Sequence, residues 1–163
     1  MNAEMPHTAW VALGANLGDA AATLRQALAD LAAQPGVEQQ ALSRFYRTAP
    51  VDATGPDYVN AVVRLRTALA PLALLDLLQA IEQRHGRRRP YPNAPRTLDL
   101  DLLCYDALRL DTPRLTLPHP RMHQRAFVLR PLADIDPELI LPQGPLADLL
   151  RTCADQAISP LQD

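Results

Sequence analysis

Apolar and polar positions divide the chain into alternating strand and helix patterns over roughly its first two thirds. A short apolar run, 9–13, stops at a glycine and predicts a buried strand. Asp19 can cap a following helix, whose leucines and alanines recur at helical spacing until Pro35. Residues 37–47 mix apolar and polar positions and predict a second strand.

The same alternation returns after residues 48–57, a stretch of turn formers that predicts a long loop. Residues 58–67 alternate strictly and predict a third strand, antiparallel to the second. A stripe of leucines from Pro71 to about residue 85 predicts a second helix. An irregular segment, 87–97, then leads to residues 98–105, whose alternation predicts a fourth strand.

The last third of the chain predicts a hairpin near 108–117, a proline-rich corner, and helices near 124–135 and 145–154. The element order favours an α+β fold with a ferredoxin-like βαββαβ core: a four-stranded antiparallel sheet with helices on one face. The last third would be a C-terminal extension, and residues 1–163 a single domain. RNA-binding modules and enzymes share this arrangement, so the fold leaves the function open.

All 16 basic residues other than histidine are arginines. The missing lysine argues against a Walker-type phosphate loop, a Schiff-base enzyme and a protein kinase, which place a lysine at the reacting group. A coding bias towards alanine, arginine and proline explains the absence of lysine equally well. The net charge of −2 argues against a protein that coats nucleic acid or an anionic membrane, so any basic site must be local.

The two cysteines, Cys104 and Cys153, follow no zinc-site or disulfide pattern. The first ten residues show no targeting signal, and no apolar run is long enough to span a bilayer. We therefore expect a cytoplasmic monomer with no membrane or nucleic-acid partner.

Two aspartates stand out in the fourth predicted strand. Asp99 and Asp101 are two residues apart, so their carboxylates leave the strand on one face, about 6 to 7 Å apart. Two anions at this separation repel each other unless a cation lies between them. Mg²⁺ is the natural partner, because it takes one or two protein carboxylates and completes its shell with water and phosphate. The alternative is a solvated pair that nearby arginines balance.

Basic residues flank this pair on both sides in the sequence. The cluster before it comprises Arg84, Arg87, Arg88, Arg89 and Arg96, and the one after it comprises Arg114, His119, Arg121, His123 and Arg125. Guanidinium groups bind phosphate oxygens bidentately, although a run such as 87–89 is by default a solvated basic loop. Because Arg96 lies three residues before Asp99, cations and carboxylates converge where a magnesium nucleotide needs both.

Five segments carry a resemblance to a known family: GANLG (14–18), FYRTAP (45–50), DYVNA (57–61), APRTLDLDLL (94–103) and LPHPRMHQRAFVLRPL (117–132). In order and spacing they resemble the 6-hydroxymethyl-7,8-dihydropterin pyrophosphokinases of folate biosynthesis, across residues 9 to about 142. The resemblance implies transfer of a pyrophosphoryl group from ATP to the pterin hydroxymethyl, with release of AMP. It also implies two Mg²⁺ ions bound by Asp99 and Asp101.

The resemblance further implies residue roles. Nucleotide contacts would come from Gln79, Glu82, Arg87, Arg89, Arg96, Leu102, Arg114, Thr116, His119 and Arg125. The catalytic group would be Arg87, Arg96, Asp99, Asp101 and His119. Pterin contacts would come from Thr48, Ala49, Val51, Tyr58, Asn60 and Phe127. Ala49, Pro92 and Asn93 depart from the residues common in the family, which puts individual lid and nucleotide contacts in doubt.

Two rival functions remain open at this stage: a ferredoxin-like RNA-binding module and a regulatory nucleotide-binding module. An RNA-binding module should carry aromatic residues on its central strands and a basic sheet face. The aromatic content of 4% and the aspartates of the fourth predicted strand argue against it. Tight binding of Mg-ATP without turnover would favour the regulatory module.

Overall fold

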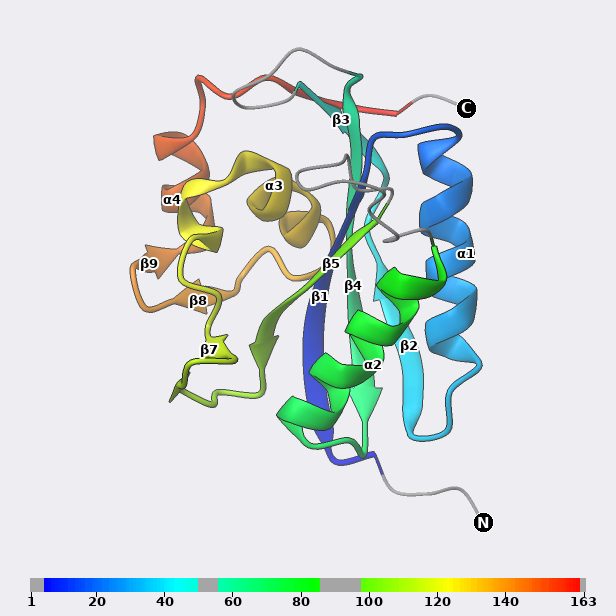
Figure 1. Ribbon diagram of the computed structural model, residues 1–163. Coiled ribbons are helices and arrows are strands. Elements are labelled where there is room, and N and C mark those ends of the chain that lie inside the picture. Colours follow the sequence, from blue (N-terminus) through cyan, green and yellow to red (C-terminus); the bar gives the residue numbers. More distant parts are fainter. Residues whose placement is uncertain (1–4, 50–55, 86–97, 162–163) are drawn as a thin grey trace.

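The computed structural model describes residues 5–49, 56–85 and 98–161, which form an antiparallel sheet covered by helices on both faces (Figure 1). The strands of this sheet run in the order β10-β3-β4-β1-β5, and β2 also pairs with β4. Their bounds are β1 (His7–Ala15), β2 (Val37–Leu42), β3 (Tyr46–Thr48), β4 (Tyr58–Thr67), β5 (Asp99–Tyr105) and β10 (Ile158–Pro160). The sheet therefore has six strands within the described ranges, where the sequence pattern predicts four.

Each face of the sheet builds its own core. Helices α1 (Ala20–Ala32) and α2 (Pro71–Arg84) cover one face, and α3 (Ala126–Ile135) covers the other with α4 (Leu146–Thr152) beside it (Figure 1). The remaining short elements are β6 (Leu110–Asp111), β7 (Thr116–Leu117), the 3₁₀ turn η1 (Met122–Gln124), β8 (Ile140–Leu141) and β9 (Gly144–Pro145). Alternation along the central strands sends every second side chain to each core, as the period of a strand requires.

The second predicted strand is split in two at Ser43. The Ser43 amide donates to the carbonyl of Val62 at 2.9 Å, while its hydroxyl oxygen accepts from the amide of Val62 at 2.9 Å. The serine side chain thus takes over a ladder bond, and the backbone leaves the strand before Tyr46 resumes it. Hydrophobic patterning cannot reveal such a break. The break arises because a side-chain hydroxyl replaces the backbone carbonyl as the acceptor for the Val62 amide.

Strand β5 contains a bulge that its sequence pattern does not predict. Leu102 lies opposite Val11 of β1, and Cys104 lies opposite Trp10, so Leu103 is an extra residue. Leu103 and Cys104 consequently both join the core on the α3 face. The predicted alternation holds up to Leu102 and is wrong beyond it.

Several predicted helix boundaries are confirmed. The side chain of Asp19 accepts from the amide of Ala22 at 3.1 Å and caps α1, and Pro71 occupies the first turn of α2. The helix predicted near 124–135 is α3, which begins at Ala126 after the 3₁₀ turn and ends at Ile135 as predicted. The peptide bond between Leu117 and Pro118 is cis. No helix in the described parts of the chain is both long and apolar enough to cross a membrane.

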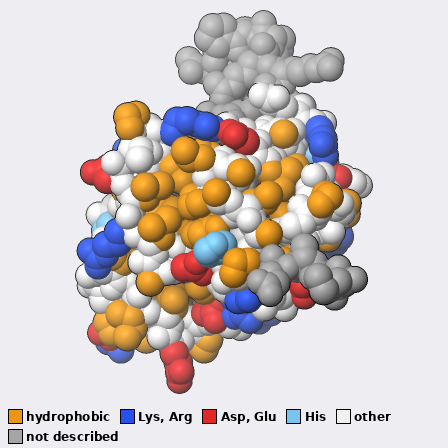
Figure 2. All heavy atoms as spheres, turned by 90° about the horizontal axis from the view of Figure 1, so that it is seen from below, with side chains coloured by type: hydrophobic (Ala, Val, Ile, Leu, Met, Phe, Trp, Pro, Cys, Tyr) orange, Lys and Arg blue, Asp and Glu red, His pale blue; other side chains and the backbone are white. Residues whose placement is uncertain are grey.

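Hydrophobic side chains gather on the end of the molecule at which β1 begins (Figure 2). Among the large hydrophobic residues that the structure describes, Leu42, Leu72, Leu108 and Ile140 are exposed, at 38%, 43%, 39% and 72%. A hollow of about 260 Å³ is lined by Trp10, Leu108 and Ile140 among others, and a second of about 340 Å³ follows α3. Neither hollow contains a residue of the predicted site.

Candidate active site

The predicted aspartate pair leaves β5 on the face that α3 covers. The three leucines that alternate with Asp99 and Asp101 lie in the opposite core against α1 and α2, as predicted. Both aspartates are half-buried, and each makes at least one interaction with its surroundings. On the neighbouring strand β1, Asp101 lies opposite Ala12 and Asp99 lies opposite Gly14.

Gly14 forms the floor between the aspartates and the next polar side chain, Asn60. Asp99, Gly14 and Asn60 lie side by side on β5, β1 and β4, so the outer two have Cα atoms about 10 Å apart. A Cβ atom on Gly14 would lie 2.9 Å from Nδ2 of Asn60, closer than a side chain tolerates. The glycine therefore leaves the space that the amide of Asn60 occupies.

Asn60 is held in place by Thr48. The hydroxyl of Thr48 donates to Oδ1 of Asn60 at 2.7 Å, and both residues are buried at 7% exposure. The side-chain oxygen Oδ1 of Asn60 thus already accepts one hydrogen bond. The side chain can still donate to a ligand from its NH₂ group and accept through the second lone pair of Oδ1. Of the other predicted pterin contacts, Tyr58 is half-buried on the same face of β4 and Ala49 is exposed after β3.

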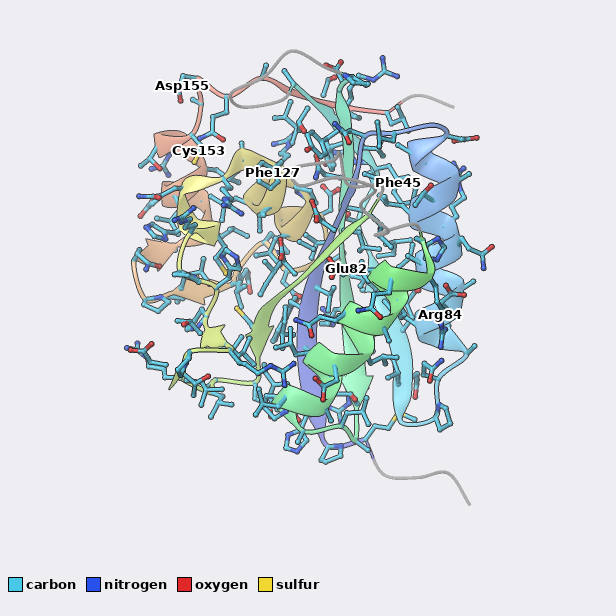
Figure 3. The ribbon with its side chains drawn as sticks, viewed as in Figure 1. Phe45, Glu82, Arg84, Phe127, Cys153 and Asp155 are labelled. Carbon is cyan, nitrogen blue, oxygen red and sulfur yellow. The ribbon has the colours of Figure 1, made fainter. Side chains whose placement is uncertain are left out.

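The start of α3 brings two further predicted residues to this face. The guanidinium carbon of Arg125 lies 5.4 Å from the centre of the Phe127 ring, a cation–π arrangement that orients both side chains. Phe127 packs against the α3-side core, whereas Phe45 lies on the opposite face of the sheet (Figure 3). Of these two phenylalanines, Phe127 therefore lies on the face of the sheet that carries Asn60, and Phe45 does not.

His119 lies beside the outer edge of β5, the edge that faces away from β1. Its amide donates to the carbonyl of Leu103 at 2.8 Å, and Nδ1 accepts from the amide of Arg121 at 3.2 Å. Burial lowers the pKa of the His119 imidazole, and the nearby Arg125 and Arg121 lower it further, while Asp101 opposes them. The ring is therefore neutral near pH 7 and, with Nδ1 accepting, carries its proton on Nε2.

Helix α2 supplies the other group of predicted nucleotide contacts. Glu82 is buried between α2 and β5, and its Oε2 accepts from the amide of Leu100 at 2.9 Å (Figure 3). Arg114 bonds Gln79 at 3.2 Å and pairs with Asp76 of the same helix. These contacts gather Gln79, Glu82 and Arg114 beside the outer edge of β5, which pairs with no further strand within the described residues.

Two predicted nucleotide contacts need separate comment. The side chain of Leu102 is 3% exposed and lies in the core, so the residue can meet a ligand only through its backbone. Thr116 is half-buried on β7. The remaining predicted site residues, Val51, Arg87, Arg89 and Arg96, lie outside the described residues, as do Pro92 and Asn93.

Two polar contacts that position α3 were not predicted from the sequence. The hydroxyl of Tyr46, a residue with no exposed surface, donates to the carboxylate of Asp134 at 2.7 Å. The side chain of Gln156 bonds the backbone at the start of α3 through Ala126. Both pairs lie far apart in sequence, and neither belongs to a local pattern that could have revealed it.

Comparison with known proteins gives consistent matches. Residues 10–137 match the family described as 7,8-dihydro-6-hydroxymethylpterin-pyrophosphokinase. A 2-amino-4-hydroxy-6-hydroxymethyldihydropteridine pyrophosphokinase of Pseudomonas aeruginosa is 46% identical over 154 residues, covering 93% of this chain and 95% of the relative. The enzyme of the same name from Synechocystis is 46% identical over 138 residues, 85% of this chain and 71% of the relative.

The fold has solved counterparts as well. The wild-type HPPK-DHPS of Plasmodium falciparum, crystallised with pteroate, superposes with a TM-score of 0.72 at 14% identity, over 93% of this chain. The present chain spans 43% of that longer protein, and at this identity the likeness concerns the fold alone. The matches favour neither an RNA-binding nor a purely regulatory module. The sequence relatives and the family match together establish that the chain belongs to the 7,8-dihydro-6-hydroxymethylpterin-pyrophosphokinase family.

Proposed function

We propose that this protein transfers the pyrophosphoryl group of ATP to the hydroxymethyl group of 6-hydroxymethyl-7,8-dihydropterin, releasing AMP, in folate biosynthesis. The observation that carries the proposal is the row formed by Asp99, Gly14 and Asn60 on one sheet face. In this row the Cα atoms of Asp99 and Asn60 lie about 10 Å apart. The carboxylate of Asp99 can bind a metal that holds the phosphates, and the amide of Asn60 can bind the heterocycle. The separation is roughly the span of a pterin with its hydroxymethyl arm.

We further infer that the strands β1, β2, β4 and β5 with helices α1 and α2 constitute a ferredoxin-like core. The strand order β2-β4-β1-β5 supports this classification. On this view α3, α4 and β10 form the C-terminal extension, and residues 1–163 act as a single domain.

The pterin would lie at the Asn60 end of the row. The NH₂ group of Asn60 would donate to the ring, with Tyr58 and Phe127 as stacking partners. Thr48, Ala49 and Val51 would add backbone contacts. The hydrogen bond from Thr48 would keep the Asn60 amide in one orientation, so that little side-chain entropy is lost when the pterin binds.

The phosphates would lie at the aspartate end. Asp99 and Asp101 offer hard oxygen donors, and within the described residues no group of three or more His, Cys, Asp or Glu side chains forms a metal cluster. Such a pair suits Mg²⁺, which keeps water and phosphate oxygens in its shell; we propose two ions. Bound there, the metal would neutralise charge on the transferring phosphates.

His119 and Arg125 would act on the same phosphates. The neutral His119 can donate from Nε2 to a phosphate oxygen, and Arg125 can add a charged donor whose direction Phe127 constrains. Arg87, Arg89 and Arg96 would add further cations. In the reaction, the hydroxymethyl oxygen bonds to the β-phosphorus and loses its proton. The bond between the β-phosphorus and the oxygen that bridges it to the α-phosphorus breaks, and AMP leaves. A loose transition state requires little of a general base, and we assign none.

The nucleotide itself would lie along the outer edge of β5. Gln79, Arg114 and Thr116 would contact it with their side chains and Leu102 with its backbone. Glu82 has a different part in this arrangement, since its carboxylate is engaged with the strand backbone. We propose that Glu82 orders the edge of β5 on which the nucleotide lies.

The test is a product assay with the purified full chain, Mg²⁺, ATP and the hydroxymethyl pterin. We expect AMP and the pterin diphosphate, with no ADP and no reaction without pterin; formation of ADP would refute the proposal. Asp99→Asn and Asp101→Asn should each lower kcat by at least about a hundredfold while the protein stays folded. We also propose a cytoplasmic monomer, which size-exclusion chromatography with light scattering can test for its mass.

A further inference from the structure

The segment from Cys153 to Leu161 contacts α3 and β3, two elements that carry residues of the candidate pterin site. It lies beyond residues 10–137, the region that matches the family model. One end of the segment reaches the start of α3 through Gln156, and the other end forms β10 beside β3. These two elements carry Phe127 and Thr48, respectively.

The contact at α3 involves a single side chain and the helix terminus. The first amides of a helix have no partner within the helix, and Arg125 at the N-cap makes no side-chain capping bond. Instead Oε1 of Gln156 accepts from the amide of Ala126, the first residue of α3, at 2.9 Å. The Nε2 atom of the same Gln156 side chain donates to the carbonyl of Gln124 at 2.8 Å. Gln156 thus holds the chain on both sides of Arg125.

The contact at β3 is a short antiparallel pairing. Ile158 lies opposite Thr48, and the amide of Leu161 donates to the carbonyl of Phe45 at 2.8 Å. The segment is anchored at its start by Cys153, which is buried in the core on the α3 face, and the amide of Gln156 donates to the carbonyl of this cysteine at 3.0 Å. A side chain fixed at its own backbone can impose a position on the helix that it caps.

We propose that Gln156 is a positioning residue for the pterin reaction: it caps α3 from a distant segment and thereby fixes the directions of Arg125 and Phe127. The inference rests on the function proposed above. It differs from a general stabilising role, because the bonded atoms, Ala126 N and Gln124 O, directly flank the residues that would meet substrate. Losing the cap should loosen the first turn of α3 more than it lowers global stability.

The experiment compares the full-length wild type with Gln156→Ala, Gln156→Glu and the control Gln143→Ala. Gln143 is an exposed glutamine in the turn between β8 and β9, outside the candidate site. We expect Gln156→Ala to raise the KM for pterin about fivefold, the equivalent of one helix cap. Gln156→Glu keeps the capping oxygen but loses the Nε2 donor to Gln124, so it should recover part of this loss, and Gln143→Ala should match the wild type.

Hydrogen exchange at residues 126–129 supplies a readout that does not depend on activity. It should accelerate at least about threefold in Gln156→Ala while the unfolding midpoint falls by no more than about 4 °C. Unchanged exchange, or an unchanged pterin KM in an active protein, would overturn the Gln156 proposal and leave the proposed function intact. A wild type that makes no pterin diphosphate would overturn the proposed function first, and the positioning role with it.

Discussion

Replacing Gly14 with alanine tests whether the bare backbone of β1 is what allows Asn60 its position. The added Cβ would lie 2.9 Å from Nδ2 of Asn60, so the amide must move. Movement endangers the 2.7 Å hydrogen bond from Thr48, a loss of about 1 kcal/mol, and crowding in a buried site adds about 1 to 3 kcal/mol. Against this, alanine lowers the entropy of the unfolded chain and returns about 0.4 to 1 kcal/mol. The net expectation is a loss of about 2 kcal/mol of unfolding free energy.

A double-mutant cycle with Asn60→Ala isolates this contact. Once the asparagine side chain is gone, alanine at position 14 meets no close neighbour, so Gly14→Ala should become neutral or slightly stabilising. Urea unfolding of the four proteins should then show a coupling energy of about 2 to 3 kcal/mol between Gly14 and Asn60. The pterin KM of Gly14→Ala should rise about tenfold, while the KM for ATP changes little. If Gly14→Ala costs the same with and without Asn60, within about 0.5 kcal/mol, the reasoning is wrong.

Three further predictions concern polar contacts around the sheet. Tyr46→Phe removes the hydroxyl bonded to Asp134 and should lower the unfolding free energy in urea by about 1 to 3 kcal/mol. Glu82→Ala leaves a backbone amide of β5 without its acceptor and should cost about as much, whereas Glu82→Gln should be milder, since it keeps an acceptor. The hydrogen bond from His85 lowers the pKa of Asp30 below 3.8, so its stabilisation is present above that pH and is lost as the pH falls through the folded-state pKa. Asp30→Asn should therefore destabilise the protein by up to about 1 kcal/mol near pH 5 and by less near pH 3; a constant difference in urea unfolding would contradict this.

The alternation of apolar and polar residues predicted most of the central strands, because side chains there pack in the core on one face of the sheet or the other. Strand β4 begins and ends at the predicted residues, 58 and 67, and its side chains alternate between two faces as expected, although a core on each face was not predicted. The pattern fails where one polar group competes with the ladder, as at Ser43, and where an extra residue enters β5 at Leu103. Strand β10 could not be predicted from its three residues, because it exists only by pairing with β3, more than a hundred positions earlier.

The candidate site divides along the same line. Asp99 and Asp101 were predictable as a pair, since their facing follows from the period of a strand alone. The open floor at Gly14 was not, because it depends on which strand β1 meets and in which register. The role of Glu82 was also hidden, because a buried carboxylate on a helix becomes intelligible only when the strand amide that it binds is known.

Helix α3 must both fill the second core and present site residues, and its two ends show how these demands are reconciled. Its apolar side chains pack against the sheet, but apolar packing alone allows a helix to slide or rotate slightly on a smooth surface. Directional bonds remove that freedom: Tyr46 fixes the last turn through Asp134, and Gln156 fixes the first turn through Ala126. The partners lie 88 residues before and 30 residues after the positions that they hold, so the aim of Phe127 is set by the whole fold. Removing both the Tyr46 and the Gln156 contacts should therefore raise the free energy of pterin binding by more than the sum of the two single effects. Either contact alone still limits the rotation of the helix.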